Sequence, residues 1–205
     1  MYLPLTDLLA CPVCGPDAGL ILYATELRDR RVLEGALGCP QCRRQWPVRG
    51  GFADLRAGST GEDDAAGAAD REEAIRIAAL LGITQGPGYL LIVGPAARHA
   101  PAVADLLEHV EVVGVDPSLE RHDERAGVSR IAAGHALPFI DGRVRGVWLS
   151  GPAATQSMED GVRVLAQRGR IVLEPAPPGA RERLASLGVE LVAEQDATVL
   201  GARVR

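Results

Sequence analysis

Lysine is absent from this chain, because all 22 basic residues are arginine. The absence excludes a P-loop lysine and a lysine Schiff base as functional groups. Aromatic residues make up only 3% of the chain, which argues against stacking platforms for single-stranded nucleic acid. No apolar run approaches the roughly 20 residues of a membrane span, and the N-terminus lacks the basic start and cleavage site of a secretory signal. We therefore expect a cytoplasmic protein without a membrane partner.

The charge balance also bears on the class of partner. The net charge is −5, which gives no general support for nucleic-acid binding, although short arginine clusters at 28–31 and 43–44 could touch RNA. A segment at 56–70 is small, polar and acidic, with no apolar period. Such a composition is typical of a linker, so we predict two domains, at 1–55 and 71–205, joined by residues 56–70.

All four cysteines lie near the N-terminus, in two Cys-x-x-Cys motifs that 24 residues separate. Each motif turns tightly enough to place two sulfurs on one ion, so we predict a tetrahedral Zn²⁺ site with Zn–S bonds of about 2.3 Å. The alternatives are two disulfides or a redox-active pair, and the paired spacing together with a reducing cytosol argues against both. Four thiolates leave no open coordination position, which indicates a structural role. The predicted ligands are Cys11, Cys14, Cys39 and Cys42.

The sequence around these motifs resembles a known family. The segments LTDLLACPVCG and LGCPQCRRQWPVRGGFADL, within residues 3–55, resemble the small zinc-ribbon proteins that activate tRNA and translation-factor methyltransferases. Trp46 stands where that family has tyrosine, and Gly50 where it has aspartate. The resemblance implies that the ribbon binds a methyltransferase domain, to which it adds strand pairing while covering apolar surface.

Strands and helices alternate in the second domain. Asp70 can cap a first helix that Gly82 ends, and strands are predicted at 89–93, 110–115, 128–132, 143–149, 169–174, 189–194 and 197–204. Helices are predicted at 101–109, 118–126, 153–166 and 178–187. Short apolar strands with intervening helices indicate a parallel sheet that is covered on both faces. The last two strands are too close for a crossover helix, so we expect a terminal antiparallel hairpin. The predicted fold class is α/β: a small zinc ribbon followed by a Rossmann-like, seven-stranded, mostly parallel sheet.

This order of elements, over residues 72–204, resembles the class I S-adenosylmethionine methyltransferases. The segments GHALPFIDG (134–142) and VRVLAQRGRIVLEP (162–175) are similar to sequences of that family. The resemblance implies S-adenosylmethionine as cofactor and a cofactor site at the ends of the first strands. The positions that match the site are Gly94, Ala96, Asp116 and His135.

The cofactor loop departs from the family pattern. Only Gly94 keeps a glycine of the loop; Ala96 and Arg98 replace the second and third, and Pro95 removes an amide donor. Ala133 stands where the family has an adenine-contacting aspartate. Asp116 keeps the place of the ribose-binding acid, although a carboxylate before Pro117 can equally form a local turn. No catalytic residue is identified by any spacing.

Two main hypotheses remain. In the first, the chain is a catalytically degenerate methyltransferase-like protein, a scaffold or regulator that binds a protein partner such as an active methyltransferase or a second copy. In the second, it is a divergent active S-adenosylmethionine-dependent methyltransferase that its own zinc ribbon stabilises. A third hypothesis is an altered, anionic ligand bound by Arg98 and His99 at a helix N-terminus, the alternative being that both side chains lie at the surface.

Overall fold

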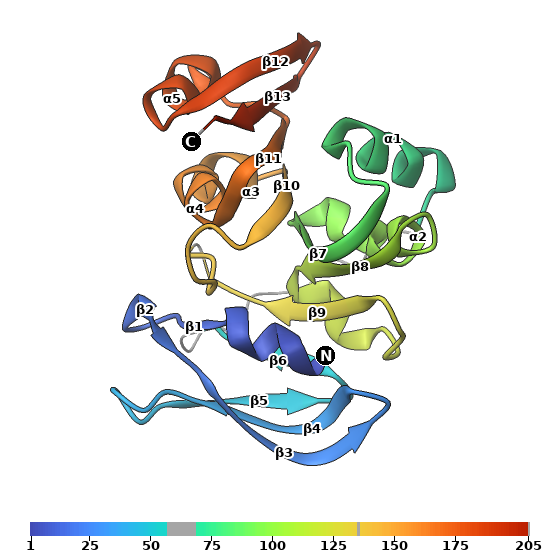
Figure 1. Cartoon of the computed structure of the whole chain (residues 1–205), viewed down its shortest axis with the longest axis vertical. Helices are drawn as coiled ribbons and strands as arrows, with labels where there is room; N and C mark the ends of the chain where they lie inside the picture. The colour runs from blue at the N-terminus through green and yellow to red at the C-terminus, as the bar shows by residue number, and fades with distance from the viewer. Residues whose placement is uncertain (57–68, 135, 205) are drawn as a thin grey trace.

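The computed structural model describes residues 1–56, 69–134 and 136–204. Its main feature is one sheet of eleven strands, in the order β12-β13-β11-β10-β7-β8-β9-β6-β5-β4-β3, to which both predicted domains contribute (Figure 1). The predicted linker falls largely on residues 57–68, which lie outside the described residues. None of the described helices has the length and apolar content that a membrane span requires.

The N-terminal ribbon is built from short strands and one 3-10 helix. Its elements are η1 (Leu3–Leu8), β1 (Ala10–Cys11), β2 (Gly15–Gly19), β3 (Ile21–Arg28), β4 (Arg31–Gly38), β5 (Gln45–Arg49) and β6 (Phe52–Asp54). Strands β3 and β4 form an antiparallel hairpin. Asp29 and Arg30 form its turn with positive φ angles of 47° and 61°.

The rest of the chain alternates between strands and helices. It contains α1 (Arg71–Leu81), β7 (Gln85–Val93), η2 (Pro95–His99), α2 (Ala100–Ala104), β8 (Glu108–Val115), η3 (Pro117–Arg121) and β9 (Val128–Ala132). It continues with β10 (Val144–Ser150), α3 (Ala153–Gln156), α4 (Met158–Val164), β11 (Leu165–Glu174), α5 (Ala180–Ser186), β12 (Val189–Gln195) and β13 (Thr198–Arg203). These seven strands include five parallel ones and the antiparallel pair β12 and β13, as predicted.

The sheet is larger than the predicted seven strands because the ribbon extends it. Strand β6 pairs in parallel with β9, with Phe52 opposite Arg130 and Asp54 opposite Ala132. Strands β5, β4 and β3 then follow in antiparallel order. The ribbon thus lies against the Rossmann-like part of its own chain, and strand pairing joins the two (Figure 1).

The side chains of the central strands alternate between two apolar clusters. Leu90 and Ile92 of β7 face the cluster that contains α1 and α2, whereas Leu91 and Val93 face the other. The cluster on the side of Leu91 and Val93 also contains Leu5 and Leu9 of the ribbon. The connection from β9 to β10 has no helix among its described residues, so ribbon side chains take part in covering this face of the sheet.

Three predicted helices differ from the structure. The helix predicted at 101–109 is only the five-residue α2, because the chain enters β8 at Glu108. His109, predicted on a helix surface, therefore lies in a strand, with a φ of 60°. The helix predicted at 118–126 is the 3-10 turn η3, and the one at 153–166 is divided at Ser157 into α3 and α4. Strand pairing from Glu108 shortens the first of these helices, and the cap by Asp116 fixes the turn of the second, so local contacts override a weak helical period.

Helix α1 follows its sequence signals closely. The Asp70 side chain accepts a hydrogen bond from the backbone N–H of Glu72 at 3.0 Å, and Gly82 ends the helix with a φ of 64°. Glu73 pairs with Arg76 at 2.7 Å. The cap and the C-terminal glycine thus set the ends of the helix.

Candidate functional site

The four cysteines come together at one end of the ribbon. Their Sγ atoms all lie within 4.8 Å of one another. The Sγ atoms of Cys11 and Cys42 are 3.7 Å apart, and those of Cys14 and Cys39 are 3.8 Å apart. A disulfide needs an S–S distance of about 2.05 Å, whereas tetrahedral bonds of about 2.3 Å to one ion give sulfur–sulfur edges of about 3.8 Å. The cluster therefore has the geometry of a metal site and not of a disulfide pair.

Backbone N–H groups support the sulfurs. Those of Val13 and Cys14 point at the Sγ of Cys11, at 3.4 Å and 3.3 Å. The backbone N–H of Cys42 lowers the pKa of the Cys39 thiol to about 7, whereas burial raises the pKa of Cys11. Four crowded thiols do not all lose their protons without a compensating cation, so the donor set fits a divalent, thiophilic ion.

The chain just before the first Cys-x-x-Cys motif pairs with a segment that follows β9, at the carboxyl end of the sheet. The backbone N–H of Ala10 donates to the carbonyl oxygen of Pro138, and that of Ile140 donates to the carbonyl oxygen of Leu8, both at 2.9 Å. Between these bonds, Leu9 and Phe139 form a β-bridge. The Leu-Pro-Phe segment (residues 137–139) is therefore paired with ribbon backbone directly beside Cys11.

The loop at the position of the methyltransferase cofactor loop uses its amides internally. The N–H of Gly94 donates to the carbonyl oxygen of Val115 at 3.0 Å, and that of Ala97 donates to the carbonyl oxygen of Gly94 at 2.8 Å. The N–H of Ala96 donates to Ser150 Oγ at 2.9 Å. Pro95 has no N–H. No backbone donor from Gly94 to Ala97 is thus left for a bound cofactor.

Side chains pack into the same place. Gly94 has a φ of 82°, and a Cβ on it would clash with the carbonyl oxygen of Ser150. A Cβ on Gly151 would lie 3.2 Å from Pro95, so the proline ring sits against this turn. Gly94, Ala96 and Asp116 line none of the five best-defined cavities in the described part of the chain. The backbone of the loop is therefore held by contacts within the fold, while Pro95 remains exposed.

Asp116 caps the turn that follows it. Its Oδ1 accepts hydrogen bonds from the backbone N–H of Ser118 at 2.9 Å and from Ser118 Oγ at 2.5 Å. This is the local turn that the Asp-Pro-Ser sequence allows. One carboxylate oxygen is therefore engaged in the fold, at the position where the family places a ribose-binding acid.

The other predicted residues are separated by the structure. Arg98 is half-buried and donates to the carbonyl oxygen of Pro95 at 3.3 Å. His99 is buried, not at the surface, and its Nδ1 accepts the backbone N–H of Asp70 at 3.0 Å. Burial lowers the pKa of His99, which favours the neutral ring. His135 lies outside the described residues. An anion site made by Arg98 and His99 together is wrong, because His99 is used as an acceptor in the core.

A buried polar network joins the ribbon to the parallel strands, and sequence reasoning missed it. Arg31 donates to Glu111 Oε1 at 2.7 Å, to Glu124 Oε1 at 2.5 Å and to the carbonyl oxygen of Val128. Arg130 donates to the carbonyl oxygen of Gly50 and lies 3.4 Å from Glu124. Of the arginine cluster at 28–31, Arg31 thus faces the inside of the protein and not RNA. In the sequence, Arg31 was recognisable only as one charge of this cluster.

The ribbon is similar to a known protein family. Residues 3–51 match the family model described as Trm112p-like protein. The N-terminal ribbon is a Trm112p-like domain. The match covers the cysteine cluster and the strands up to the turn before β6. A comparison with curated protein sequences gave no match.

Comparison with solved structures places the rest of the chain. A geranyl diphosphate methyltransferase in complex with SAM is similar with a TM-score of 0.54 and 14% identity, over 65% of this chain and 85% of that chain. The corresponding C-methyltransferase of Streptomyces coelicolor A3(2) has a TM-score of 0.53, 13% identity, and coverage of 65% and 76%. A chain in the complex between the Haloferax volcanii Trm112 methyltransferase activator and a methyltransferase has a TM-score of 0.51, 15% identity, and coverage of 64% and 88%. At these identities the likeness shows the class I methyltransferase fold.

Proposed function

We propose that this chain is a catalytically degenerate methyltransferase-like protein, which acts as a binding or regulatory scaffold and whose Trm112p-like ribbon is bound to its own Rossmann-like part. The observation that carries the proposal is the closed cofactor loop. The donors of Gly94, Ala96 and Ala97 and one oxygen of Asp116 are all used by the fold itself. A cofactor in the family's position would have to break these hydrogen bonds, and each buried donor left unpaired costs about 1–3 kcal/mol.

The metal in the ribbon is, in this proposal, a structural Zn²⁺ ion. Cys11, Cys14, Cys39 and Cys42 would hold it, and it would supply folding free energy to a small domain without taking part in a reaction. The reducing cytosol that we expect for this protein keeps the thiols available.

The pairing of the ribbon with its own chain limits the surface that a protein partner can use. The β6 edge pairs with β9 of the same chain, so a separate methyltransferase cannot use that edge unless β6 leaves β9. We therefore infer that the ribbon stabilises its own chain, and that a regulatory partner binds a different surface.

Calorimetric titration with S-adenosylmethionine and S-adenosylhomocysteine tests the proposal. We expect no heat of binding at millimolar cofactor for protein that is folded and carries one zinc per chain. Micromolar binding that Asp116→Ala abolishes would instead establish the alternative, a divergent active methyltransferase. A Pro95→Gly/Ala96→Gly/Arg98→Gly variant restores the glycines and the amide donor of the family's loop, and binding gained by it alone would identify the loop residues as the cause of the loss.

A further inference from the structure

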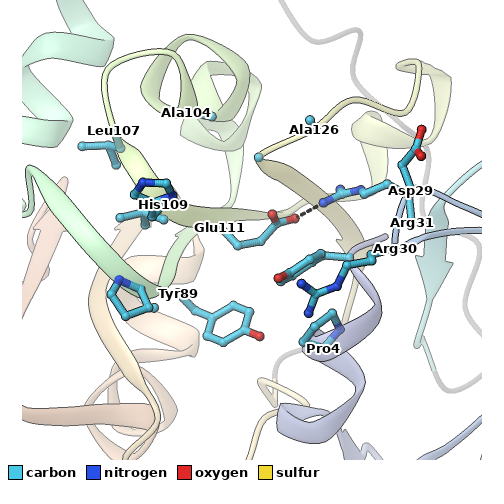
Figure 2. A pocket seen from close by; sticks show the side chains of 15 residues that line it. Pro4, Asp29, Arg30, Arg31, Tyr89, Ala104, Leu107, His109, Glu111 and Ala126 are labelled. Carbon is cyan, nitrogen blue, oxygen red and sulfur yellow. Dashed lines mark hydrogen bonds and ion pairs between the residues drawn. The ribbon is translucent and has the colours of Figure 1, made fainter.

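A cavity of about 560 Å³ lies at the other end of the parallel sheet from the cofactor loop. It forms where the turn between β3 and β4 and the N-terminal residues of the ribbon meet the first residues of β7 and β8 (Figure 2). Both parts of the chain are needed to form its walls. Its volume lies within the range of about 300–1,000 Å³ that is typical of small-molecule sites, and such sites are common between domains.

One wall of the cavity carries a buried carboxylate. Glu111 is 8% exposed, and its Oε1 accepts hydrogen bonds from Arg31 at 2.7 Å and from Ser129 Oγ at 2.6 Å. Its Oε2 takes part in neither bond. Burial raises the pKa of Glu111 even beside Arg31, so a further positive group near Oε2 would stabilise the charged form. The carboxylate has acceptor capacity that the fold does not use.

Another part of the wall carries an arginine, Arg30, that has no carboxylate partner among the described residues. Arg30 is exposed and forms no ion pair within the described part of the chain, and its guanidinium lies 5.4 Å from the centre of the Tyr2 ring. Its carbonyl oxygen accepts the N–H of Leu3 at 2.8 Å, which fixes the turn. Figure 2 shows the Arg30 side chain directed into the cavity and the Asp29 carboxylate turned away from it. Arg30 is therefore available to an anion.

The cavity is also lined by Asp29, Arg31 and His109, and much of the remaining wall is apolar. Pro4, Pro87 and Leu107 contribute hydrocarbon surface. Burial raises the pKa of Tyr89 to about 12, so its hydroxyl remains a neutral hydrogen-bond donor. In Figure 2 the Tyr89 ring extends into the cavity toward the side of Arg30. A phenol at this place can assist the guanidinium in holding an anionic oxygen.

We propose that this cavity binds a small zwitterion of the α-amino acid type with an apolar side chain. The ligand's carboxylate lies on the Arg30 guanidinium and its ammonium donates to Glu111 Oε2. Its side chain packs against Leu107 and the two prolines. A simple carboxylic acid leaves Glu111 Oε2 without a donor, and a simple amine leaves Arg30 without an anion, so only a ligand with both charges matches both walls.

Calorimetric titration with leucine, leucine methyl ester and 4-methylpentanoic acid tests this proposal. The ester lacks the carboxylate and the acid lacks the ammonium group, while all three keep the same side chain. We expect leucine to bind at least about tenfold more tightly than either analogue, because a hydrogen bond to a charged group contributes about 1.5–3 kcal/mol. Equal binding of either analogue, or no binding of leucine at millimolar concentration, would overturn the proposal.

Single substitutions test whether leucine binds in this cavity. Arg30→Gln changes an exposed side chain, so the protein should fold normally and lose leucine affinity about tenfold. Arg28→Gln is the matched control, because this exposed arginine at the end of β3 pairs with Glu26 and does not line the cavity. Unchanged leucine binding in Arg30→Gln, or equal losses in both variants, would refute the site. Glu111→Gln should weaken leucine while leaving the weaker binding of 4-methylpentanoic acid unchanged.

Discussion

The buried contacts of Arg31 give the sharpest prediction for the junction between the ribbon and the parallel sheet. The side chain of Arg31 is 10% exposed and contacts two carboxylates, those of Glu111 and Glu124, which are 8% and 12% exposed. Arg31→Met keeps an apolar stem of similar length but removes the charge. Glu111 then loses its ion-pair partner while it remains shielded from water, whereas Glu124 keeps the N-terminal ammonium at 2.9 Å and Arg130 at 3.4 Å. The variant should therefore be strongly destabilised.

The magnitude follows from the burial of the pair. Removing one partner of a buried ion pair costs about 3–5 kcal/mol, since it leaves an uncompensated charge. An exposed pair contributes only about 0–1 kcal/mol. The pair of Arg28 and Glu26 is 72% and 50% exposed and lies on β3, the strand paired with β4, which Arg31 begins. Arg28→Met is thus a control with the same chemical change in the same hairpin.

Urea unfolding measures the effect. We follow the transition by far-ultraviolet circular dichroism and by release of the ribbon metal to a chromogenic chelator. In the wild type the two signals should change together, because one sheet and one apolar cluster join the two parts. Arg31→Met should lower the free energy of unfolding by about 3–5 kcal/mol. Arg28→Met should stay within about 1 kcal/mol of the wild type.

A double variant separates the buried charge from lost packing. In Arg31→Met/Glu111→Gln the orphaned carboxylate becomes neutral, so part of the lost stability should return, with a coupling energy of about 0.5–3 kcal/mol. A loss below about 1 kcal/mol for Arg31→Met would refute the reasoning. So would a double variant whose loss equals the sum of the two single losses, because the residues would then not interact.

Three further predictions concern the loop, the buried histidine and the metal. Gly94→Ala should destabilise the protein by about 1–3 kcal/mol or more in urea unfolding, because it strains a positive φ and pushes a Cβ against Ser150. Burial lowers the pKa of His99, so the stability that its neutral ring provides is present above about pH 6.5 and is lost as the pH falls through the lower folded-state pKa. His99→Gln should flatten that loss, which is at most about 1.4 kcal/mol per pH unit. Chelation of the metal should speed hydrogen exchange at the Ala10 amide, which pairs with Pro138 beside the first metal motif.

Each of these three has a matched comparison. Gly19→Ala adds a Cβ in open space, so equal losses for Gly94 and Gly19 would show that the Ser150 contact is unimportant. A pH slope that persists in His99→Gln would assign the slope to other groups. If chelation leaves the Ala10 amide as protected as the amides of β11, the metal does not hold the Leu-Pro-Phe segment through the ribbon.

Local patterns in the sequence were sufficient for the metal cluster and for the strand order. The Cys-x-x-Cys motifs place their sulfurs by tight turns of a few residues, and that geometry needs no knowledge of the remaining fold. The strands were visible because both faces of a parallel sheet are buried, which gives short continuous apolar runs such as 89–93. The helix ends were visible only at α1, where Asp70 and Gly82 provide clear capping residues.

Long-range partners could not be predicted in the same way. Arg31 and Glu111 are 80 positions apart, and the bond from Ala96 to Ser150 Oγ joins residues 54 positions apart. No periodicity or spacing connects such residues before the strands are placed side by side. The pairing of β6 with β9 rests on three residues, too few to register as a strand signal in the sequence. The turn at Asp116 was foreseeable, because its partner Ser118 is only two residues away.

The position of the ribbon explains how the cofactor loop can change while the fold is kept. At the amino ends of the parallel strands the ribbon supplies Arg31 to two buried carboxylates, and at their carboxyl ends it pairs Leu8 and Ala10 with the Leu-Pro-Phe segment. A ligand that binds only the folded state stabilises that state. Here covalent attachment of the ribbon provides comparable contacts permanently, at both ends of the sheet. In the scaffold that we propose, stability would not require a bound cofactor, so residues such as Pro95 and Arg98 would be tolerated in the loop as long as the ribbon stays on β9.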